Sequence, residues 1–240
     1  MRIHNLLLII RLFELSLLNL LWILIPIVLV FFIYIRWVDD KITLPYALIR
    51  MVLQLIMIGY VLTYIFEAKS PYLVVLILAV MLVSASMISL RPLQKKQKSL
   101  YLYTFISIFL GGSFTLAIIM IAVLNVTAWY EPRLLIPLAG MTFANAMNAV
   151  SIAAERFESE MSRENSYEEA RSTAYKAALI PIINALFAVG LVSLPGMMTG
   201  QILSGVDPLI AVRYQMMVML MILSSAGLSV AVYLRLLKKV

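Results

Sequence analysis

The sequence predicts an all-α integral membrane protein with about seven transmembrane helices. Of its 240 residues, 63% are hydrophobic and only 13% are charged, whereas soluble domains carry about 45–50% apolar and about 25% charged residues. The mean hydropathy is +1.01, and apolar runs long enough to cross about 30 Å of hydrocarbon fill most of the chain. The longest polar stretch, residues 153–176, is too short to bury a core of its own. We therefore expect one transmembrane domain over residues 1–240.

The apolar runs define the expected spans and their orientation. Short cytoplasmic loops are enriched in Lys and Arg. Alternate loops divide these residues unequally: fourteen lie on one side of the membrane, and the other side has only Arg2, Arg11, Lys69 and Arg133. Arg213 lies inside the last span and is not counted. The N-terminus is therefore expected outside the cell and the C-terminus inside, in a multi-pass protein of the inner (plasma) membrane. The expected spans are Leu17–Ile35, Pro45–Phe66, Tyr72–Leu90, Leu102–Leu124, Leu134–Ile152, Leu179–Leu194 and Leu209–Leu234.

Several catalytic classes lack the residues that they require. The one histidine is His4, there is no cysteine, and no Gly-Lys dipeptide exists to form a phosphate-binding loop of the Walker A type. The expected spans contain no aspartate, and the last contains no lysine for a retinal Schiff base. The basic residues lie in loops and span ends rather than on one surface helix, which argues against a nucleic-acid partner. We therefore expect no enzyme activity and no cofactor on this chain.

The polar groups that remain inside the expected spans are mostly amides. Asn145 and Asn148 lie three residues apart in the fifth span, with Met141 on the same helical stripe. Amides are costly to strand in hydrocarbon, so they are expected to face the bundle interior. There they either bond to neighbouring helices or line a substrate pathway. The pathway hypothesis adds two residues of later spans, Asn184 and Gln215.

Small and sulfur-containing residues form two further patterns. Gly111 with Gly112, and Gly140 with Ala144, would let neighbouring helices approach closely. The fifteen methionines suit soft metal ions, although most are expected to be packing residues, and the metal preference stays open. The segment 194–208 is rich in Gly and Pro and is expected to form a re-entrant or partly buried turn at the outer face. Its candidate functional residues are Pro195, Gly196, Met197, Met198, Gly200 and Gln201.

One long segment resembles a known family of permeases. Residues Ala177–Val218, "AALIPIINALFAVGLVSLPGMMTGQILSGVDPLIAVRYQMMV", with "LIPLAGMTFANAMNAV" from Leu135 and "RMVLQLIMIGYVLTYIF" from Arg50, resemble the FetB-like family, which includes bacterial iron-export permeases and plant relatives in aluminium tolerance. The resemblance implies a homodimeric permease subunit of an ABC-type exporter of metal ions such as iron. A separate cytoplasmic ATPase would bind ATP and power it. A non-transporting membrane scaffold or receptor is the alternative.

Residues 153–176 are the expected contact with that ATPase. Phe157, Met161, Tyr167, Ala170 and Ala174 are spaced as in one or two amphipathic helices, which we expect to lie across the span axis on the cytoplasmic side. The segment "SRENSYEEARSTAYK" from Ser162 lacks the Gly-containing turn of the family. The alternative is a solvated loop that only connects two spans. The charged candidates for coupling are Glu155, Arg156, Glu168, Glu169 and Arg171.

Overall fold

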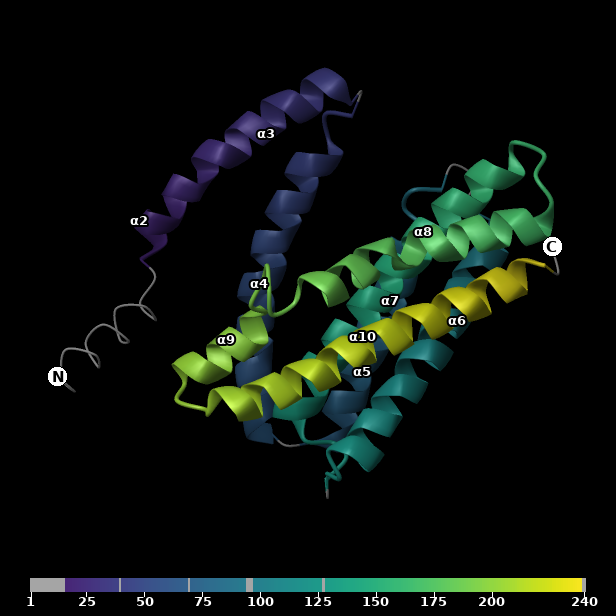
Figure 1. Ribbon diagram of the computed structural model, residues 1–240. Coiled ribbons are helices and arrows are strands. Elements are labelled where there is room, and N and C mark those ends of the chain that lie inside the picture. The colour runs from purple at the N-terminus through teal and green to yellow at the C-terminus, as the bar shows by residue number, and fades with distance from the viewer. Residues whose placement is uncertain (1–15, 39, 69, 94–96, 127, 239–240) are drawn as a thin grey trace. The chain divides into compact units, whose positions relative to one another are not determined.

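A computed structural model of the chain describes residues 16–38, 40–68, 70–93, 97–126 and 128–238. The apolar stretch Leu6–Leu20, which the sequence places near the lipid headgroups, therefore lies mostly outside the described residues. Within them the chain is helical, as predicted (Figure 1). Its contacts divide it into two compact units, residues 1–64 and 65–240. Each unit is described separately, and the expectation of a single domain stays a prediction.

The first unit contains two long helices joined by a capped turn. A short start, α2 (Leu17–Leu20) and the 3₁₀ turn η1 (Leu21–Ile23), leads into α3 (Leu24–Trp37), and α4 begins at Thr43 and ends at Ala68. Between them, Asp40 Oδ1 accepts hydrogen bonds from the backbone N–H groups of Ile42 and Thr43, both at 3.0 Å. A hydrogen bond from the side chain of Thr43, together with these two backbone bonds, holds the carboxylate in its charged form and lowers the pKa of Asp40 to about 2.

The second unit is a bundle in which α10 is the central helix. Its elements are α5 (Pro71–Ser89), α6 (Lys98–Ile118) with a π-helical end η2 (Ile119–Val123), α7 (Pro132–Met161), α8 (Tyr167–Ala188), α9 (Gly196–Leu203) and α10 (Pro208–Leu237). Helix α10 packs against α6, α7, α8 and α9, and α5 packs against α6 and α7. Three of these helices begin with proline, whose missing N–H costs nothing in the first turn of a helix.

Glycines in α6 permit close contacts with α7 and α10. A Cβ placed on Gly111 would lie 2.9 Å from Cα of Ser229 in α10, and one placed on Gly112 would lie 2.9 Å from the ring of Phe143 in α7. A Cβ on Gly140 would meet the methyl group of Met81 at 3.3 Å. These three glycines therefore pack closely against neighbouring helices, as predicted. Ala144, which was expected to do the same, is exposed.

Six helices among the described residues are long and apolar enough to cross a membrane, close to the seven expected. They are Leu18–Trp37, Thr43–Phe66, Pro71–Ser89, Lys98–Val123, Pro132–Met161 and Pro208–Leu237. The expected span Leu179–Leu194 differs, because α8 starts earlier, at Tyr167, and ends at Ala188. A turn follows, with a bridge between Val189 and Ser193. The apolar part of α8, Ala177–Ala188, is thus about 18 Å long, which is well short of the roughly 30 Å that a span needs.

Candidate functional site

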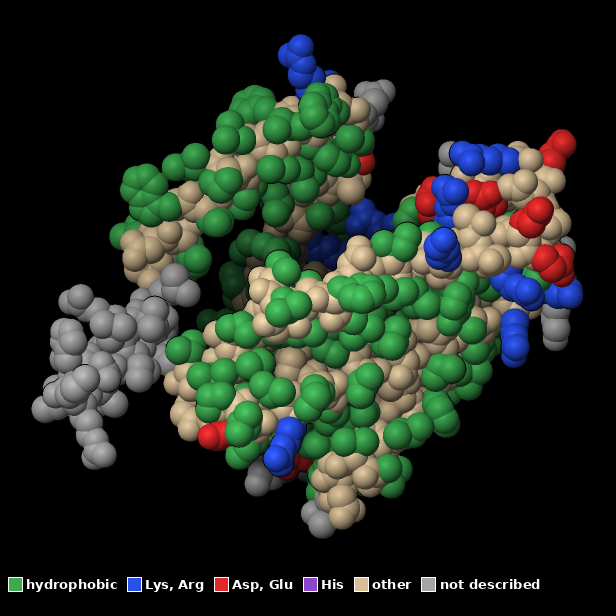
Figure 2. Space-filling model, in the orientation of Figure 1, with side chains coloured by type: hydrophobic (Ala, Val, Ile, Leu, Met, Phe, Trp, Pro, Cys, Tyr) green, Lys and Arg blue, Asp and Glu red, His purple; other side chains and the backbone are tan. Residues whose placement is uncertain are grey.

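The charged end of the bundle is a tight turn between α7 and α8, residues 162–166. Charged side chains of both signs gather over this end, while the part of the bundle visible between the ends is largely hydrophobic (Figure 2). Ser166 caps α8 through a capping box: its backbone N–H donates to Glu169 Oε2 at 3.1 Å, and the N–H of Glu169 donates to Ser166 Oγ at 3.3 Å. Ser166 Oγ also donates to Glu169 Oε2, at 2.8 Å. Glu164 takes a left-handed conformation, φ 62°, at a position that glycine would favour.

The turn is held together by one buried carboxylate. Glu160 is only 7% exposed; its Oε1 is 2.6 Å from Nη2 of Arg156 and 3.9 Å from Nη1 of Arg163, and its Oε2 accepts from Nδ2 of Asn165 at 2.6 Å. Sequence reasoning missed Glu160. The available signal was Arg156, four residues earlier on the same helical face.

The expected amphipathic segment 153–176 has a different form in the structure. It is not a helix lying across the span axis, because residues 153–161 continue α7 and residues 167–176 begin α8. Most of the predicted apolar face packs inward: the rings of Phe157 and Tyr167 are 5.8 Å apart, and Ala170 and Ala174 are fully buried, whereas Met161 is exposed. Tyr167 Oη also donates to the carbonyl of Leu234 in α10 at 2.7 Å. The segment is therefore a rigid helical hairpin.

The five coupling candidates lie on this hairpin in different environments. Glu155 is exposed, whereas Arg156 is engaged by Glu160. Glu168 is 3.9 Å from Nζ of Lys238. Glu169 belongs to the capping box, where hydrogen bonds from Ser166 lower the pKa of its carboxyl. The guanidinium of Arg171 lies 5.6 Å from the ring centre of Tyr167. Glu155 is therefore the candidate best placed to meet a partner.

The predicted amide stripe lies on the outer face of α7. Met141 and Asn145 are half-buried and Asn148 is exposed. Nδ2 of Asn145 donates to the carbonyl of Met141 in its own helix at 2.8 Å. Among the described residues, Asn148 has no hydrogen-bond partner. The amides thus do not bond to neighbouring helices of the bundle, and inside a membrane they need protein or water, because acyl chains offer no hydrogen bonds.

The other two pathway candidates lie in α8 and α10. Asn184 is exposed on α8. It follows the α7–α8 turn by about as many residues as Asn145 precedes that turn. In an antiparallel hairpin, this spacing places the two residues at about the same distance from the turn. Gln215 is instead buried, at 6% exposure, and its Oε1 has no hydrogen-bond partner among the described residues. The hairpin thus puts two predicted amides on α7 and α8 at one depth, while Gln215 lies inside the bundle.

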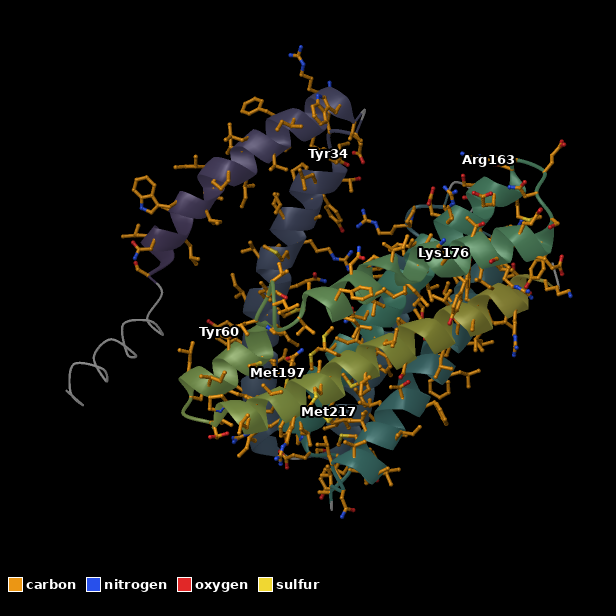
Figure 3. All side chains as sticks on the ribbon, in the orientation of Figure 1. Tyr34, Tyr60, Arg163, Lys176, Met197 and Met217 are labelled. Atoms are coloured by element: carbon orange, nitrogen blue, oxygen red, sulfur yellow. The ribbon has the colours of Figure 1, made fainter. Side chains whose placement is uncertain are left out.

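The predicted outer turn contains a short helix. Residues 189–195 form the turn, α9 holds Met197, Met198, Gly200 and Gln201, and Gly205 at φ 90° leads toward α10. Helix α9, which carries Met197, packs on α10, which carries Met217 (Figure 3). Met217 is buried, whereas Met216 is exposed. The Oε1 atom of Gln201 is buried without a partner among the described residues, as is that of Gln215. Two orphaned carboxamide oxygens therefore belong to adjacent helices.

No conventional metal cage accompanies these groups. In the part of the chain that the structure describes, His, Cys, Asp and Glu form no cluster of three or more that could hold a metal ion. The two buried oxygens without a partner, Gln201 Oε1 in α9 and Gln215 Oε1 in α10, are neutral amide oxygens, while the carboxylate of Asp207 caps the start of α10. Neutral amide oxygens can replace part of a cation's hydration shell without holding the ion tightly.

Comparison with known proteins agrees with this architecture. The family model described as "Uncharacterised protein family (UPF0014)" matches residues 15–240. The UPF0014 membrane protein slr1647 of Synechocystis is 36% identical over 195 residues, 75% of each chain. The probable iron export permease protein FetB of Escherichia coli is 36% identical over 205 residues, 77% of this chain and 76% of FetB. STAR2 of rice is 31% identical over 199 residues, 77% of this chain and 68% of STAR2. No solved structure matches the chain.

The resemblance to FetB-like permeases and their plant relatives is thereby confirmed. The match includes the helices that carry the amide stripe, the α7–α8 turn and α9. Its relatives are named as membrane proteins, in agreement with the six apolar helices described above. The chain belongs to the UPF0014 family of membrane proteins.

Proposed function

We propose that this chain is the membrane-spanning permease subunit of an ATP-driven exporter of metal ions such as iron. It would act in the inner (plasma) membrane as a homodimer, and a separate cytoplasmic ATPase would supply the energy. The observation that carries the proposal is the α7–α8 hairpin, whose apolar helices continue beyond the bundle into a rigid, charged turn. The name of the E. coli relative, an iron export permease, supports the choice of cargo.

The hairpin is suited to transmit force because its parts are fixed to one another. The buried Glu160 joins α7 to the turn, the capping box fixes the start of α8, and Tyr167 ties α8 to α10. A partner that pushes on the turn would therefore move α7, α8 and α10 together. Such rigid-body movement is one of the common routes to alternating access.

The exposed amides of α7 and α8 support a pathway at a surface that a second copy would complete. Asn145, Asn148 and Asn184 offer neutral oxygens at half-buried or exposed positions of membrane helices. Gln215 and Gln201 offer further oxygens near α9. Weak binding at several neutral sites would let an exported ion leave again.

Reconstitution tests the proposal. The permease and its candidate ATPase, purified together, would be placed in liposomes, and ATP turnover and uptake of Fe²⁺ into inside-out vesicles would be measured. We expect both activities to require both chains and to be stimulated by the ion. The matched control is the same ATPase with an unrelated membrane protein.

A membrane scaffold that binds partners without transport is the second candidate. The exposed stripe of α7 would serve that role equally well as a contact for another membrane protein. It predicts that the complex assembles while no ion crosses the membrane and ATP turnover is indifferent to Fe²⁺. Such a result would refute the transport function and leave the partner interaction standing.

A further inference from the structure

We propose that a hollow between α8 and α10 binds the phosphate group of an anionic membrane lipid. The hollow has a volume of about 480 Å³, and its lining includes the cations Arg171, Lys176 and Arg235 and the hydroxyl side chains Ser172 and Tyr175. Ala231 and Leu234 add small and apolar surface from α10. We call it the basic hollow. The inference does not depend on the transport function proposed above.

The two helices present matching faces to this hollow. Two pairs of lining residues lie one helical turn apart in α8, Arg171 with Tyr175 and Ser172 with Lys176, so the four share a face of that helix. The phenol of Tyr175 reaches α10, where a Cβ placed on Gly227 would lie 3.3 Å from its Oη. The ring therefore closes one side of the hollow, and substitution of Gly227 would disturb it.

The cations of the hollow are not neutralised by the protein. Among the described residues, neither Lys176 nor Arg235 has a carboxylate within 4.0 Å. Two acidic residues of the same helix are engaged elsewhere, Glu168 with Lys238 and Glu169 with Ser166. Three positive charges around one hollow repel one another, so an anion bound between them would be favoured.

Arg171 is held in place without losing its charge. Its guanidinium carbon lies 5.6 Å from the ring centre of Tyr167, whose Oη in turn donates to the carbonyl of Leu234. Among the described residues, Arg171 has no carboxylate within 4.0 Å, so its N–H groups can donate to an oxygen of a bound anion. Planar guanidinium groups bind phosphate oxygens in pairs, whereas an ammonium acts as a point charge.

The position of the hollow along the helices indicates a lipid rather than a soluble anion. Arg235 lies in the last turn of α10, at the end of a long apolar span. Lys176 lies directly before the apolar part of α8, Ala177–Ala188. The cations therefore lie at the level where hydrocarbon gives way to headgroups, and Ala231 and Leu234 offer apolar surface beside them. Basic pockets between membrane helices at this depth suit anionic headgroups.

Native mass spectrometry of the purified full-length chain tests the inference. The detergent-solubilised protein would be titrated with phosphatidylglycerol, with phosphatidylcholine as the neutral comparison. We expect selective binding of phosphatidylglycerol, weakened about fivefold by Lys176→Gln and about fivefold by Arg235→Gln, as expected when one surface cation is lost. Arg235→Lys should keep most of the binding, since it keeps the charge.

The matched control is Arg213→Gln, which removes an exposed arginine near the opposite end of α10. It should bind phosphatidylglycerol as the natural sequence does, and all variants should elute as folded protein. Equal binding by every variant, or equal loss in Arg213→Gln, would refute the inference. Displacement of the lipid by millimolar inorganic phosphate would assign the hollow to a soluble anion instead. Unchanged lipid binding with lost ATPase association would assign it to an acidic protein partner.

Discussion

Gly111 of α6 faces Ser229 of α10 with so little space that a Cβ on Gly111 would come within 2.9 Å of the Ser229 Cα atom. The Oγ atom of Ser229 is buried and has no hydrogen-bond partner among the described residues. The contact therefore depends on backbone proximity rather than on a polar bond. It joins the central helix of the bundle to its neighbour.

Replacing Gly111 with alanine should destabilise the protein. The added methyl group would meet backbone atoms that cannot move aside, and overpacking of this kind costs about 1–3 kcal/mol. Thermal unfolding in detergent would measure the loss. The matched control is Gly59→Ala in α4, where a Cβ would meet nothing within 4 Å and the gain in helix propensity is about 1 kcal/mol. Equal melting temperatures for the two variants would contradict the close approach.

The orientation of the chain can be tested by cysteine labelling, because the sequence has no cysteine of its own. Gln97 and Glu131 precede α6 and α7, at opposite ends of α6. In intact cells an impermeant thiol reagent should label Glu131→Cys, and it should label Gln97→Cys only after the membrane is opened. The reverse pattern would overturn the prediction that the N-terminus is outside.

The coupling surface is best tested at Glu155. Its exposed carboxylate has no structural bond among the described residues, so Glu155→Lys should leave the fold intact and weaken ATPase co-purification about tenfold, or ~1.4 kcal/mol. The matched control, Glu131→Lys, lies at the other end of the bundle. Unchanged co-purification of Glu155→Lys would remove this residue from the coupling surface. Charge reversal at Glu169 is unsuitable, because it would also break the cap of α8.

The pathway prediction is tested at Asn148. Its carboxamide is exposed and makes no hydrogen bond among the described residues, so Asn148→Leu should leave assembly unchanged while lowering ion transport about tenfold, or ~1.4 kcal/mol in barrier height. Thr63→Val in α4 serves as control, since Thr63 bonds only within its own helix, to the carbonyl of Gly59. Full transport by Asn148→Leu would show that the stripe has only a packing role.

The capping box should make the start of α8 sensitive to acid. Hydrogen bonds from Ser166 lower the pKa of Glu169 below its ordinary value, which is near 4.3. The capping box therefore stabilises the folded state fully when the pH is above this ordinary pKa. That stabilisation is lost as the pH falls through the lowered pKa of the folded state. Amide hydrogen exchange in α8 should therefore accelerate at acidic pH. Glu169→Gln, which can still form the box, should remove this pH dependence; if it does not, another group is responsible.

Much of the fold could be predicted because a membrane-spanning helix is specified by a continuous run of apolar residues. Runs of apolar residues located six of the seven expected spans, and most of the predicted span ends lie within a few residues of the observed ones. The small-residue pattern predicted the close contacts of Gly111, Gly112 and Gly140, since a small residue leaves room for a neighbouring helix: its backbone at Gly111, and the side chains of Phe143 and Met81 at the other two. The family resemblance was also carried by sequence alone. Orientation and partners stay predictions.

The sequence by itself determined the class of protein, the spans and the residues that carry polar groups into them. Only the tertiary structure decided that residues 153–176 form a hairpin rather than a crossing helix, because its apolar face packs against a helix distant in sequence, as where Tyr167 Oη donates to the carbonyl of Leu234 in α10. It also separated the amides, leaving Asn148 exposed and Gln215 buried. Hydropathy gives the depth of a residue in the membrane, whereas its neighbours depend on how helices distant in sequence pack together.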